Sequence, residues 1–385
     1  MPVLWLCGPA GVGKSTVAWQ LYKELSQAGV HVAFADADQL CMCYPPQAGD
    51  PDRERLKATN LAAMIPHYQA AGARCVVLAG VLDPVLGLRR ELLPDADVTV
   101  VRLRADREEL VRRFAERAEK RADLDQLLRD VRDQADRMDV SDFADLCVET
   151  TGVPASGVAG LVRNSCPGWP GFGETISEQA ASPREIAHPE ASRADGRVLL
   201  ICGPTGVGKS TIAFRVYMQS LNAGFTAGYV DLDQIGFVSP PRQEDPGIHR
   251  LKARNLAAMC ENYRAAGATH LIACGPIENN EALRTYIDAL PAASITLCRL
   301  HAGPEELTRR VISRGSGGSW PQPGDPLLRQ SAEYLRAVAR QAISADATFE
   351  REHLGTVRID TNGHTPDESA SLIAAATGWP NSSDF

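Results

Sequence analysis

Short, wholly apolar segments alternate along this chain with longer segments in which apolar residues recur every three or four positions. The first kind has the length of buried strands and the second has the period of amphipathic helices. In the N-terminal part this pattern predicts strands at 3–7, 30–35, 75–79, 98–103 and 146–148. It predicts helices at 14–28, 55–71, 107–117 and 155–162, and a helical, highly charged stretch that follows the third of these to about residue 138. Such alternation is typical of an α/β fold with a parallel sheet covered by helices on both faces.

The same pattern occurs twice. Residues 3–80 align without gaps on residues 198–275, and about 37 of these 78 positions are identical. The shared blocks are CGPxGVGKST, DxDQ, LKAxNLAAM and YxAAGA, and each copy closes on a Gly-Trp-Pro triplet. A period near 200 residues indicates a duplicated domain and not a solenoid. We therefore expect one domain at 1–170, a polar linker at 171–196 and a second domain at 197–385.

Charge and composition narrow the possible partners. Asp and Glu outnumber Lys and Arg by 48 to 40, which gives a net charge of -8 and argues against a nucleic-acid partner. No apolar run approaches the roughly 20 residues of a membrane span, and no targeting segment precedes the first strand. The ten cysteines are scattered, several of them inside strand-like runs, as in cytoplasmic proteins with reduced thiols. The sequence predicts no oligomeric state.

A glycine-rich loop follows the first strand of each copy. Residues 8–15 and 203–210 both fit GxxxxGK[ST] between a strand and a helix, where backbone N–H groups and the positive helix end cradle phosphates. The lysine is expected to reach the β- and γ-phosphates and the serine to offer its hydroxyl to Mg²⁺. The next threonine either contacts phosphate or is a first-turn helix residue. No NKxD-like tetrapeptide is present, which favours ATP over GTP. The expected ATP-binding residues are Gly8, Gly11, Gly13, Lys14, Ser15, Thr16, Gly203, Gly206, Gly208, Lys209, Ser210 and Thr211.

An acidic pair follows the second strand of each copy, Asp36 and Asp38 in the first and Asp231 and Asp233 in the second. Residues at i and i+2 of an extended segment point to the same side, and the carboxyl ends of parallel strands face the ligand crevice. A phosphate-loop transferase needs one acid near Mg²⁺ and one that orients or deprotonates the acceptor hydroxyl. A strand-end turn in which Asp caps a helix is the structural alternative.

With these motifs, each copy resembles the shikimate-kinase and gluconate-kinase branch of the nucleoside-monophosphate-kinase-like P-loop fold. The resemblance rests on GxxGxGKST, on DxDQ about 22 residues after the lysine, and on the glycine that ends the third strand (Gly80, Gly275). It implies that Asp36 and Asp231 lie on the metal side, with Ser15 and Ser210, and that Asp38 and Asp233 contact the acceptor. The chain also resembles actinobacterial ATP-binding proteins with VDLDQ and LKARNLAA motifs, which does not identify an acceptor.

Two departures limit the resemblance. Shikimate kinases carry GGG after the third strand, whereas this chain has Ala-Gly-Val (79–81) and Cys-Gly-Pro (274–276), so a shikimate site is not supported. Neither third strand ends in Asp or Glu, which argues against a motor, transporter or AAA protein, whose attacking water usually needs such an acid.

Two further recurring groups are candidates for acceptor binding and for transition-state stabilisation. Lys57 and Asn60 recur as Lys252 and Asn255 on one helix face, which suits an acceptor with a carboxylate, a phosphate or several hydroxyls; a solvated polar face is the alternative. Arginines after the fourth strand recur as well, and in related kinases this region forms a lid whose arginines stabilise the transferring phosphoryl group. Arg117 and Arg314 are the candidates, although a surface cation is the alternative for either.

The sequence thus predicts a kinase that transfers phosphate from ATP to a small-molecule hydroxyl, with Mg²⁺ and two sites per chain. The second lid, around Trp320, is rich in Gly and Pro and is expected to close on ligand, whereas the first has helix-forming residues and is expected to be ordered. Two other functions stay open. One is a nucleotide-binding regulator without transfer, and the other is a nucleotide or polynucleotide 5′-hydroxyl kinase.

Overall fold

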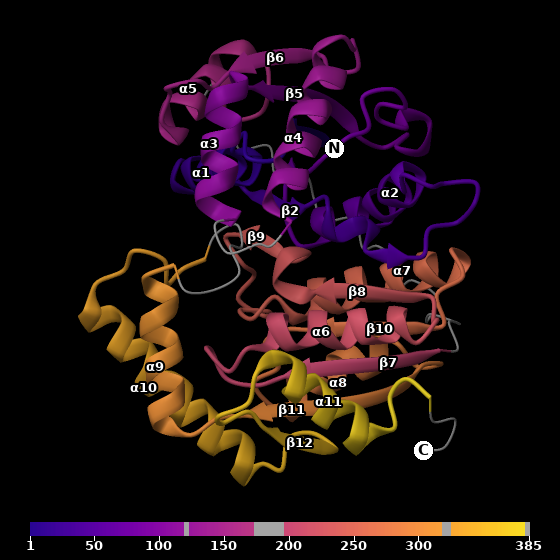
Figure 1. Ribbon diagram of the computed structural model, residues 1–385, viewed down its shortest axis with the longest axis vertical. Helices are drawn as coiled ribbons and strands as arrows, with labels where there is room; N and C mark the ends of the chain where they lie inside the picture. The colour runs from indigo at the N-terminus through magenta and orange to yellow at the C-terminus, as the bar shows by residue number, and fades with distance from the viewer. Residues whose placement is uncertain (119–122, 173–195, 318–324, 382–385) are drawn as a thin grey trace. The chain divides into compact units, whose positions relative to one another are not determined.

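The computed structural model describes residues 1–118, 123–172, 196–317 and 325–381 (Figure 1). The chain divides into two compact units. Unit 1 consists of Met1–Cys41, Asp50–Ile186 and Gly236–Ile248, and unit 2 consists of Met42–Gly49, Ala187–Ile235 and His249–Phe385. Most of the expected linker lies outside the described residues.

Unit 1 has a six-stranded sheet in the order β6-β5-β1-β4-β2-β9. Its strands are β1 (Pro2–Cys7), β2 (Val32–Asp36), β4 (Cys75–Ala79), β5 (Asp97–Arg104), β6 (Leu146–Glu149) and β9 (Phe237–Ser239). Its helices are α1 (Lys14–Gln27), α2 (Glu54–Ala70), α3 (Arg107–Ala118), α4 (Leu124–Asp139) and α5 (Ala155–Ser165). Helix α1 packs beside α5, and α3 packs beside α4 (Figure 1).

Unit 2 repeats this plan in the order β12-β11-β7-β10-β8-β3. Its strands are β3 (Cys43–Tyr44), β7 (Arg197–Cys202), β8 (Ala227–Asp231), β10 (His270–Cys274), β11 (Ser294–His301) and β12 (Val357–Asp360). Its helices are α6 (Lys209–Asn222), α7 (His249–Ala265), α8 (Asn280–Ala289), α9 (Pro304–Gly315), α10 (Ala332–Arg351) and α11 (Pro366–Thr377). The predicted elements of the first copy are present, with ends shifted by a few residues.

One of the two edge strands of each sheet comes from the other sequence repeat. In unit 1, β9 pairs antiparallel with β2, with Phe237 opposite Phe34; in unit 2, β3 pairs antiparallel with β8. All other strand pairs are parallel, as the strand–helix alternation predicts. Each repeat therefore lends the segment that follows its DxDQ motif to the sheet of the other repeat. The expected boundaries at 1–170 and 197–385 assign β3 and β9 each to the domain whose sheet it does not join.

Apolar packing explains why the exchanged segments stay in place. In unit 1 the ring of Phe237 lies 4.9 Å from that of Trp19 and 5.7 Å from that of Phe34, between centroids. In unit 2, Met42 and Tyr44 pack against the core, and the N–H of Tyr229 donates to the carbonyl of Met42 at 2.8 Å. Because an edge strand leaves N–H and C=O groups unpaired, each lent strand also satisfies backbone groups of its host sheet.

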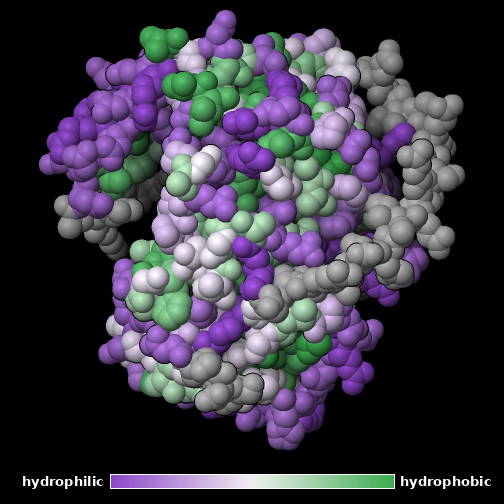
Figure 2. All heavy atoms as spheres, turned by 90° about the vertical axis from the view of Figure 1, so that its right-hand side faces the viewer, coloured by the Kyte–Doolittle hydropathy of each residue, from purple (hydrophilic) through white to green (hydrophobic). Residues whose placement is uncertain are grey.

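The sheets are apolar through most of their length because helices cover their faces. Strands β1 and β7 each have five consecutive buried residues at their carboxyl ends, which lead directly into the glycine loops. Within the described residues, no helix is long and apolar enough to cross a lipid bilayer. The face shown in Figure 2 is mainly hydrophilic, with apolar side chains in small separate groups.

Candidate active site

The two glycine loops have nearly the same backbone conformation. Gly8, Gly11 and Gly13 have φ of 140°, 83° and 102°, and the corresponding angles in unit 2 are 148°, 85° and 101°. These values lie in the region that side chains with a Cβ rarely adopt. A Cβ on Gly8 would also lie 2.5 Å from the carbonyl oxygen of Leu103. The glycines of the motif are therefore required by the backbone itself.

Each loop leaves the first N–H groups of its helix open to a ligand. Helices α1 and α6 begin after a glycine, and no side chain caps them. Lys14 Nζ donates to the carbonyls of Gly8 and Pro9 at 2.9 and 3.1 Å, and Lys209 Nζ makes the same pair of bonds in unit 2. Uncapped N–H groups, a helix dipole and an ammonium group converge, as an anion-binding loop requires. Thr16 and Thr211 lie in the first turns of these helices.

The acidic pairs lie at the same end of the sheets as the loops. Asp36 ends β2 and Asp231 ends β8, and each accepts a hydrogen bond from the N–H of the second aspartate of its pair. In unit 2, Ser210 Oγ donates to Asp231 Oδ2 at 2.7 Å. The second aspartates differ. Asp38 accepts from the N–H of Val81, whereas Asp233 forms an ion pair with Lys252 at 2.8 Å.

The structure explains why a glycine follows each third strand, at Gly80 and Gly275. A Cβ on Gly80 would lie 2.6 Å from Cβ of Ala37, and one on Gly275 would lie 2.7 Å from Cβ of Leu232. Ala37 and Leu232 are the middle residues of the two DxD motifs. The glycine therefore lets the acidic turn pack directly on the end of the neighbouring strand.

The donor set fits Mg²⁺. A serine hydroxyl and a carboxylate meet in unit 2, and both are the oxygen ligands that Mg²⁺ prefers. Among the described residues there is no group of three or more His, Cys, Asp or Glu that could hold a metal ion. Mg²⁺ commonly keeps water and phosphate oxygens as its remaining ligands, so Ser210 and Asp231 of unit 2 could supply the protein ligands.

The environment of Asp36 makes it a weak acid. Burial, followed by the nearby charge of Asp38, raises the pKa of Asp36 from 3.8 to about 7. Hydrogen bonds from the backbone and the charge of Lys14 oppose this shift. In unit 2, burial lowers the pKa of Lys209, and Asp233 counteracts that effect. A cation bound beside Asp36 would favour the ionised form of that carboxyl in unit 1. A phosphate bound beside Lys209 would favour the charged form of that ammonium group in unit 2.

The helix after the acidic turn contributes two buried polar residues in each unit. Asn60 is fully buried and its amide donates to the carbonyl of Leu40 at 2.6 Å, and Asn255 makes the equivalent bond to Ile235. Lys57 is buried too and pairs with Glu54 at 2.8 Å. The structure places these asparagines inside the protein, where they hold the helix to the turn that follows DxDQ. Lys252 contacts the acidic pair of its unit through Asp233, whereas Lys57 bonds Glu54 and the carbonyl of Val81.

The environment of the two lysines differs between the units. Glu54 of unit 1 is replaced by His249 in unit 2, and Asp83 is replaced by Glu278. His249 Nε2 lies 2.7 Å from Glu278 Oε2, and its Nδ1 lies 3.1 Å from the hydroxyl of Tyr286. Burial acts to raise the pKa of Glu278, but the hydrogen bond and charge of His249, a backbone hydrogen bond and the charge of Lys252 together outweigh it and lower the pKa. These residues were not foreseen; their only sequence signal is that they differ at matched positions.

The lid arginines fall into two groups. Arg113 and Arg310 connect helix, phosphate loop and strand end, because each bonds a glutamate one turn earlier, a carbonyl of the glycine loop and a threonine. Arg314 Nε pairs with Asp325 Oδ2 at 2.7 Å. The side chain of Arg117 lies outside the described residues, as do 119–122 of the first lid and 318–324 of the second, with Trp320.

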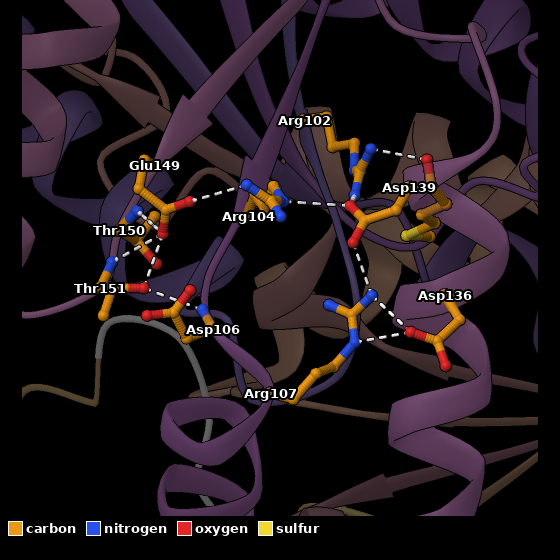
Figure 3. Close-up of polar contacts among 10 residues, drawn as sticks. Arg102, Arg104, Asp106, Arg107, Asp136, Asp139, Glu149, Thr150 and Thr151 are labelled. Atoms are coloured by element: carbon orange, nitrogen blue, oxygen red, sulfur yellow. Dashed lines mark hydrogen bonds and ion pairs between the residues drawn. The ribbon is translucent and has the colours of Figure 1, made fainter.

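An arginine–carboxylate network fixes the lid helices of unit 1 (Figure 3). Arg107 at the start of α3 bonds Asp136 Oδ1 at 2.7 Å and Asp139 Oδ2 at 2.5 Å, both on α4. Asp139 also bonds Arg102 and Arg104 of β5, and Arg104 reaches Glu149 of β6. The network joins two strands to two helices and so sets the position of α4 over the phosphate loop.

A family comparison agrees with the phosphate-loop assignment. Residues 3–140 match the family model AAA_33, described as an AAA domain. The argument against a motor, transporter or AAA protein rests on the missing Asp or Glu at the end of each third strand. The third strands do end in Ala79 and Cys274, so the match concerns a phosphate-loop domain without that acid.

Among curated proteins, the chain is 40% identical over 53 residues to a probable adenylyl-sulfate kinase of Archaeoglobus fulgidus. This alignment covers 14% of the chain and 34% of that protein, so the chain spans about a third of its curated relative.

Solved structures match single units of the chain. A tunicamycin resistance protein of Deinococcus radiodurans is 20% identical, over 47% of this chain and 94% of its own, with a TM-score of 0.31. A gluconokinase of Sinorhizobium meliloti 1021 is 12% identical, over 48% and 94%, with a TM-score of 0.31. A shikimate kinase of Acinetobacter baumannii is 20% identical, over 44% and 94%, with a TM-score of 0.29.

Proposed function

We propose that this protein is an ATP-dependent phosphotransferase that phosphorylates a hydroxyl of a small metabolite, with one phosphate-loop site in each unit. The observation that carries the proposal is the joint placement of an anion-binding loop and an acidic pair at one end of each sheet. In unit 2 the loop serine and the first aspartate are 2.7 Å apart, and the second aspartate is ion-paired with Lys252. A cytoplasmic location fits the ten cysteines, all of which are free.

In this proposal the loop N–H groups and the lysine bind the phosphates of ATP. Ser15 with Asp36, and Ser210 with Asp231, hold Mg²⁺, which neutralises charge on the β- and γ-phosphates. Asp38 or Asp233 accepts the proton of the acceptor hydroxyl. The hydroxyl oxygen then bonds to the γ-phosphorus, the bond from that phosphorus to the bridging oxygen breaks, and ADP leaves.

The remaining residues bind the acceptor and stabilise the transferring group. Lys57 and Lys252 lie next to the acidic pairs and suit an anionic or polyhydroxylated acceptor. Asn60 and Asn255, which are fully buried and bond backbone carbonyls, are proposed to position the helix that carries these lysines. Arg117 and Arg314 are proposed to stabilise charge on the phosphoryl group. In unit 2 this requires Arg314 to leave Asp325, or to keep it as a positioning partner.

One observation favours a regulatory role for unit 2. Its proton-accepting aspartate is engaged by Lys252, whereas Asp38 of unit 1 is bonded only by backbone N–H among the contacts recorded for the described residues. Unit 2 would then bind nucleotide and influence unit 1 without transferring phosphate. A nucleotide as the acceptor is compatible with the same site chemistry.

The test is release of ADP from Mg·ATP with a panel of sugars, sugar acids, other hydroxy acids and nucleosides. Product mass spectrometry identifies phosphorylated acceptors, and protection from heating selects candidates because a bound acceptor raises stability by mass action. We expect one acceptor class to gain a phosphoryl group. Mg²⁺-dependent nucleotide binding with no transfer to any of these classes would favour the regulator instead.

A further inference from the structure

One hydrogen bond links the helix that follows the first lid to the phosphate loop of unit 1. The backbone N–H of Ala10 donates to Oε1 of Gln134, on α4, at 3.0 Å. Ala10 is the third residue of the glycine loop. Within the described residues, the Nε2 amide of Gln134 has no hydrogen-bond partner. A half-buried glutamine therefore presents two unused donors beside a loop built for an anion.

The peptide group involved is also held by the loop lysine. Lys14 Nζ donates to the carbonyl of Pro9, and Gln134 accepts from the N–H of Ala10, so the two side chains bind the two ends of the Pro9–Ala10 peptide. Because the lysine of such a loop reaches the β- and γ-phosphates, this peptide lies at the γ end of the phosphate site. The donors of Gln134 are therefore near the terminal phosphate and away from the helix N-terminus.

The rest of α4 holds Gln134 in this place. Val131, Ala135 and Met138 are buried on one face of the helix, and Asp139 at its end is fixed by the arginine network of Figure 3. Gln134 stands next to that buried face. A rigid support of this kind is what a contact with a ligand needs, since a mobile side chain would lose entropy on binding.

Unit 2 lacks this residue. Helix α10 buries Ala342, Asp346 and Phe349 at the same spacing as the buried residues of α4, and its second-last residue, Glu350, pairs with Arg299, which matches Arg102 of unit 1. This correspondence aligns Gln134 with Ala345. A methyl group offers no hydrogen bond, so the two sites differ at the γ end although their loops are alike.

We propose that Gln134 contacts the γ-phosphate of the nucleotide in unit 1 and makes that site, but not the site of unit 2, distinguish nucleoside triphosphate from diphosphate. The inference rests on the proposed function, because it requires nucleotide in the loop. It adds a phosphate-contacting residue that comes from α4 and not from the lid arginines.

The experiment uses the full chain with Lys209→Ala, so that unit 1 supplies the nucleotide site, and measures ADP and AMPPNP affinity by calorimetry with Mg²⁺. Gln134→Ala should weaken AMPPNP about tenfold, as expected for loss of a hydrogen bond to a charged group, and change ADP less than about twofold. Gln134→Glu keeps the acceptor for Ala10 but replaces the donors with negative charge, so it should weaken AMPPNP at least as much. Gln126→Ala, an exposed position on the same helix, is the control.

The outcomes separate this inference from the proposed function. If Gln134→Ala weakens both nucleotides equally, or if Gln134→Glu binds AMPPNP as the parent chain does, the residue only supports the loop and the inference is wrong. In either case the proposed kinase stands. If the parent chain binds neither nucleotide, the proposed function fails and the inference with it.

Discussion

At the scale of single residues, the two acids of each pair occupy different surroundings. Asp36 is at a strand end near the charge of the loop lysine, Lys14. Asp38 is exposed and accepts a hydrogen bond from the N–H of Val81, at the start of the loop after β4. We therefore propose the inner acid for the cation and the outer acid for the acceptor. Two predictions follow from this division, one for each acid.

Replacing the outer acid should separate binding from transfer. We expect Asp38→Asn and Asp233→Asn to spare Mg·ATP binding and to lower phosphoryl transfer by a factor on the order of 10² to 10⁴, because a positioned proton acceptor is lost. Calorimetry and ADP-release rates on each variant check this. Loss of Mg·ATP binding in both variants would reverse the roles assigned within the pair.

The raised pKa of Asp36 predicts a pH dependence of stability. In the unfolded chain this carboxyl ionises near 3.8, but in the folded protein it holds its proton up to about 7. Its contribution to stability is therefore fully present below pH 3.8 and is lost as pH rises toward and through 7. At pH 8 without Mg²⁺, Asp36→Asn should be more stable than wild type by up to about 4 kcal/mol.

Thermal unfolding from pH 4 to pH 8 measures this difference. The gap between Asp36→Asn and wild type should open with rising pH, and Mg²⁺ with nucleotide should close it by stabilising the ionised acid of the wild type. Asp288→Asn, at an exposed position of α8, is the control and should follow the wild-type curve. A gap that is constant with pH would contradict the shifted pKa.

At the scale of elements, the exchanged strands have the most consequence. Strand β2, which ends at Asp36, is flanked by β4 on one side and by β9 of the other repeat on the other. Strand β8, which ends at Asp231, is flanked likewise by β10 and β3. Each acid-bearing strand therefore depends on residues that the sequence assigns to the other copy.

A mutation in one repeat should consequently loosen the sheet of the other. Phe237→Ala removes a ring that packs on Trp19 and Phe34, and it should destabilise unit 1 by about 1–3 kcal/mol. Hydrogen exchange followed by mass spectrometry should show faster exchange in 32–36 than in 227–231. Tyr44→Ala is the matched variant and should show the opposite preference. Faster exchange of 227–231 in Phe237→Ala would argue against the exchange.

At the scale of the whole molecule, two complete phosphate loops stand in two units with separate cores. The loops share their backbone angles and lysine contacts, whereas the residues around the acidic pairs differ. We therefore expect two nucleotides per chain and different acceptor chemistry, or transfer in only one unit.

Loop-lysine variants test this arrangement. Lys14→Ala and Lys209→Ala should each weaken ATP at their own site by about 10- to 100-fold and leave the other site largely intact, because each lysine bonds the loop carbonyls of its own unit. Calorimetry on both single variants and the double variant measures stoichiometry. One nucleotide per wild-type chain would refute the two-site arrangement.

The sequence by itself determined the strand–helix order, the duplication and the phosphate loops. These follow from local causes, since apolar period specifies strand or helix and the loop angles require glycine where GxxxxGK has it. The acidic pairs could be predicted for the same reason, because strand ends meet at one edge of a parallel sheet.

Only the tertiary structure decided what depends on contacts between distant residues. The sequence could not show that β3 and β9 change places, because a two- or three-residue edge strand carries almost no periodicity. Its partner is set by packing, on Trp19 and Phe34 in unit 1 and on the apolar core in unit 2. It also could not show that Asn60 is buried and bonds the carbonyl of Leu40, or that Gln134 accepts from the N–H of Ala10 across 124 positions. Folding decides how deeply a polar side chain is buried and which groups it hydrogen-bonds. The same residue type can therefore have a structural role at one position and a functional role at another.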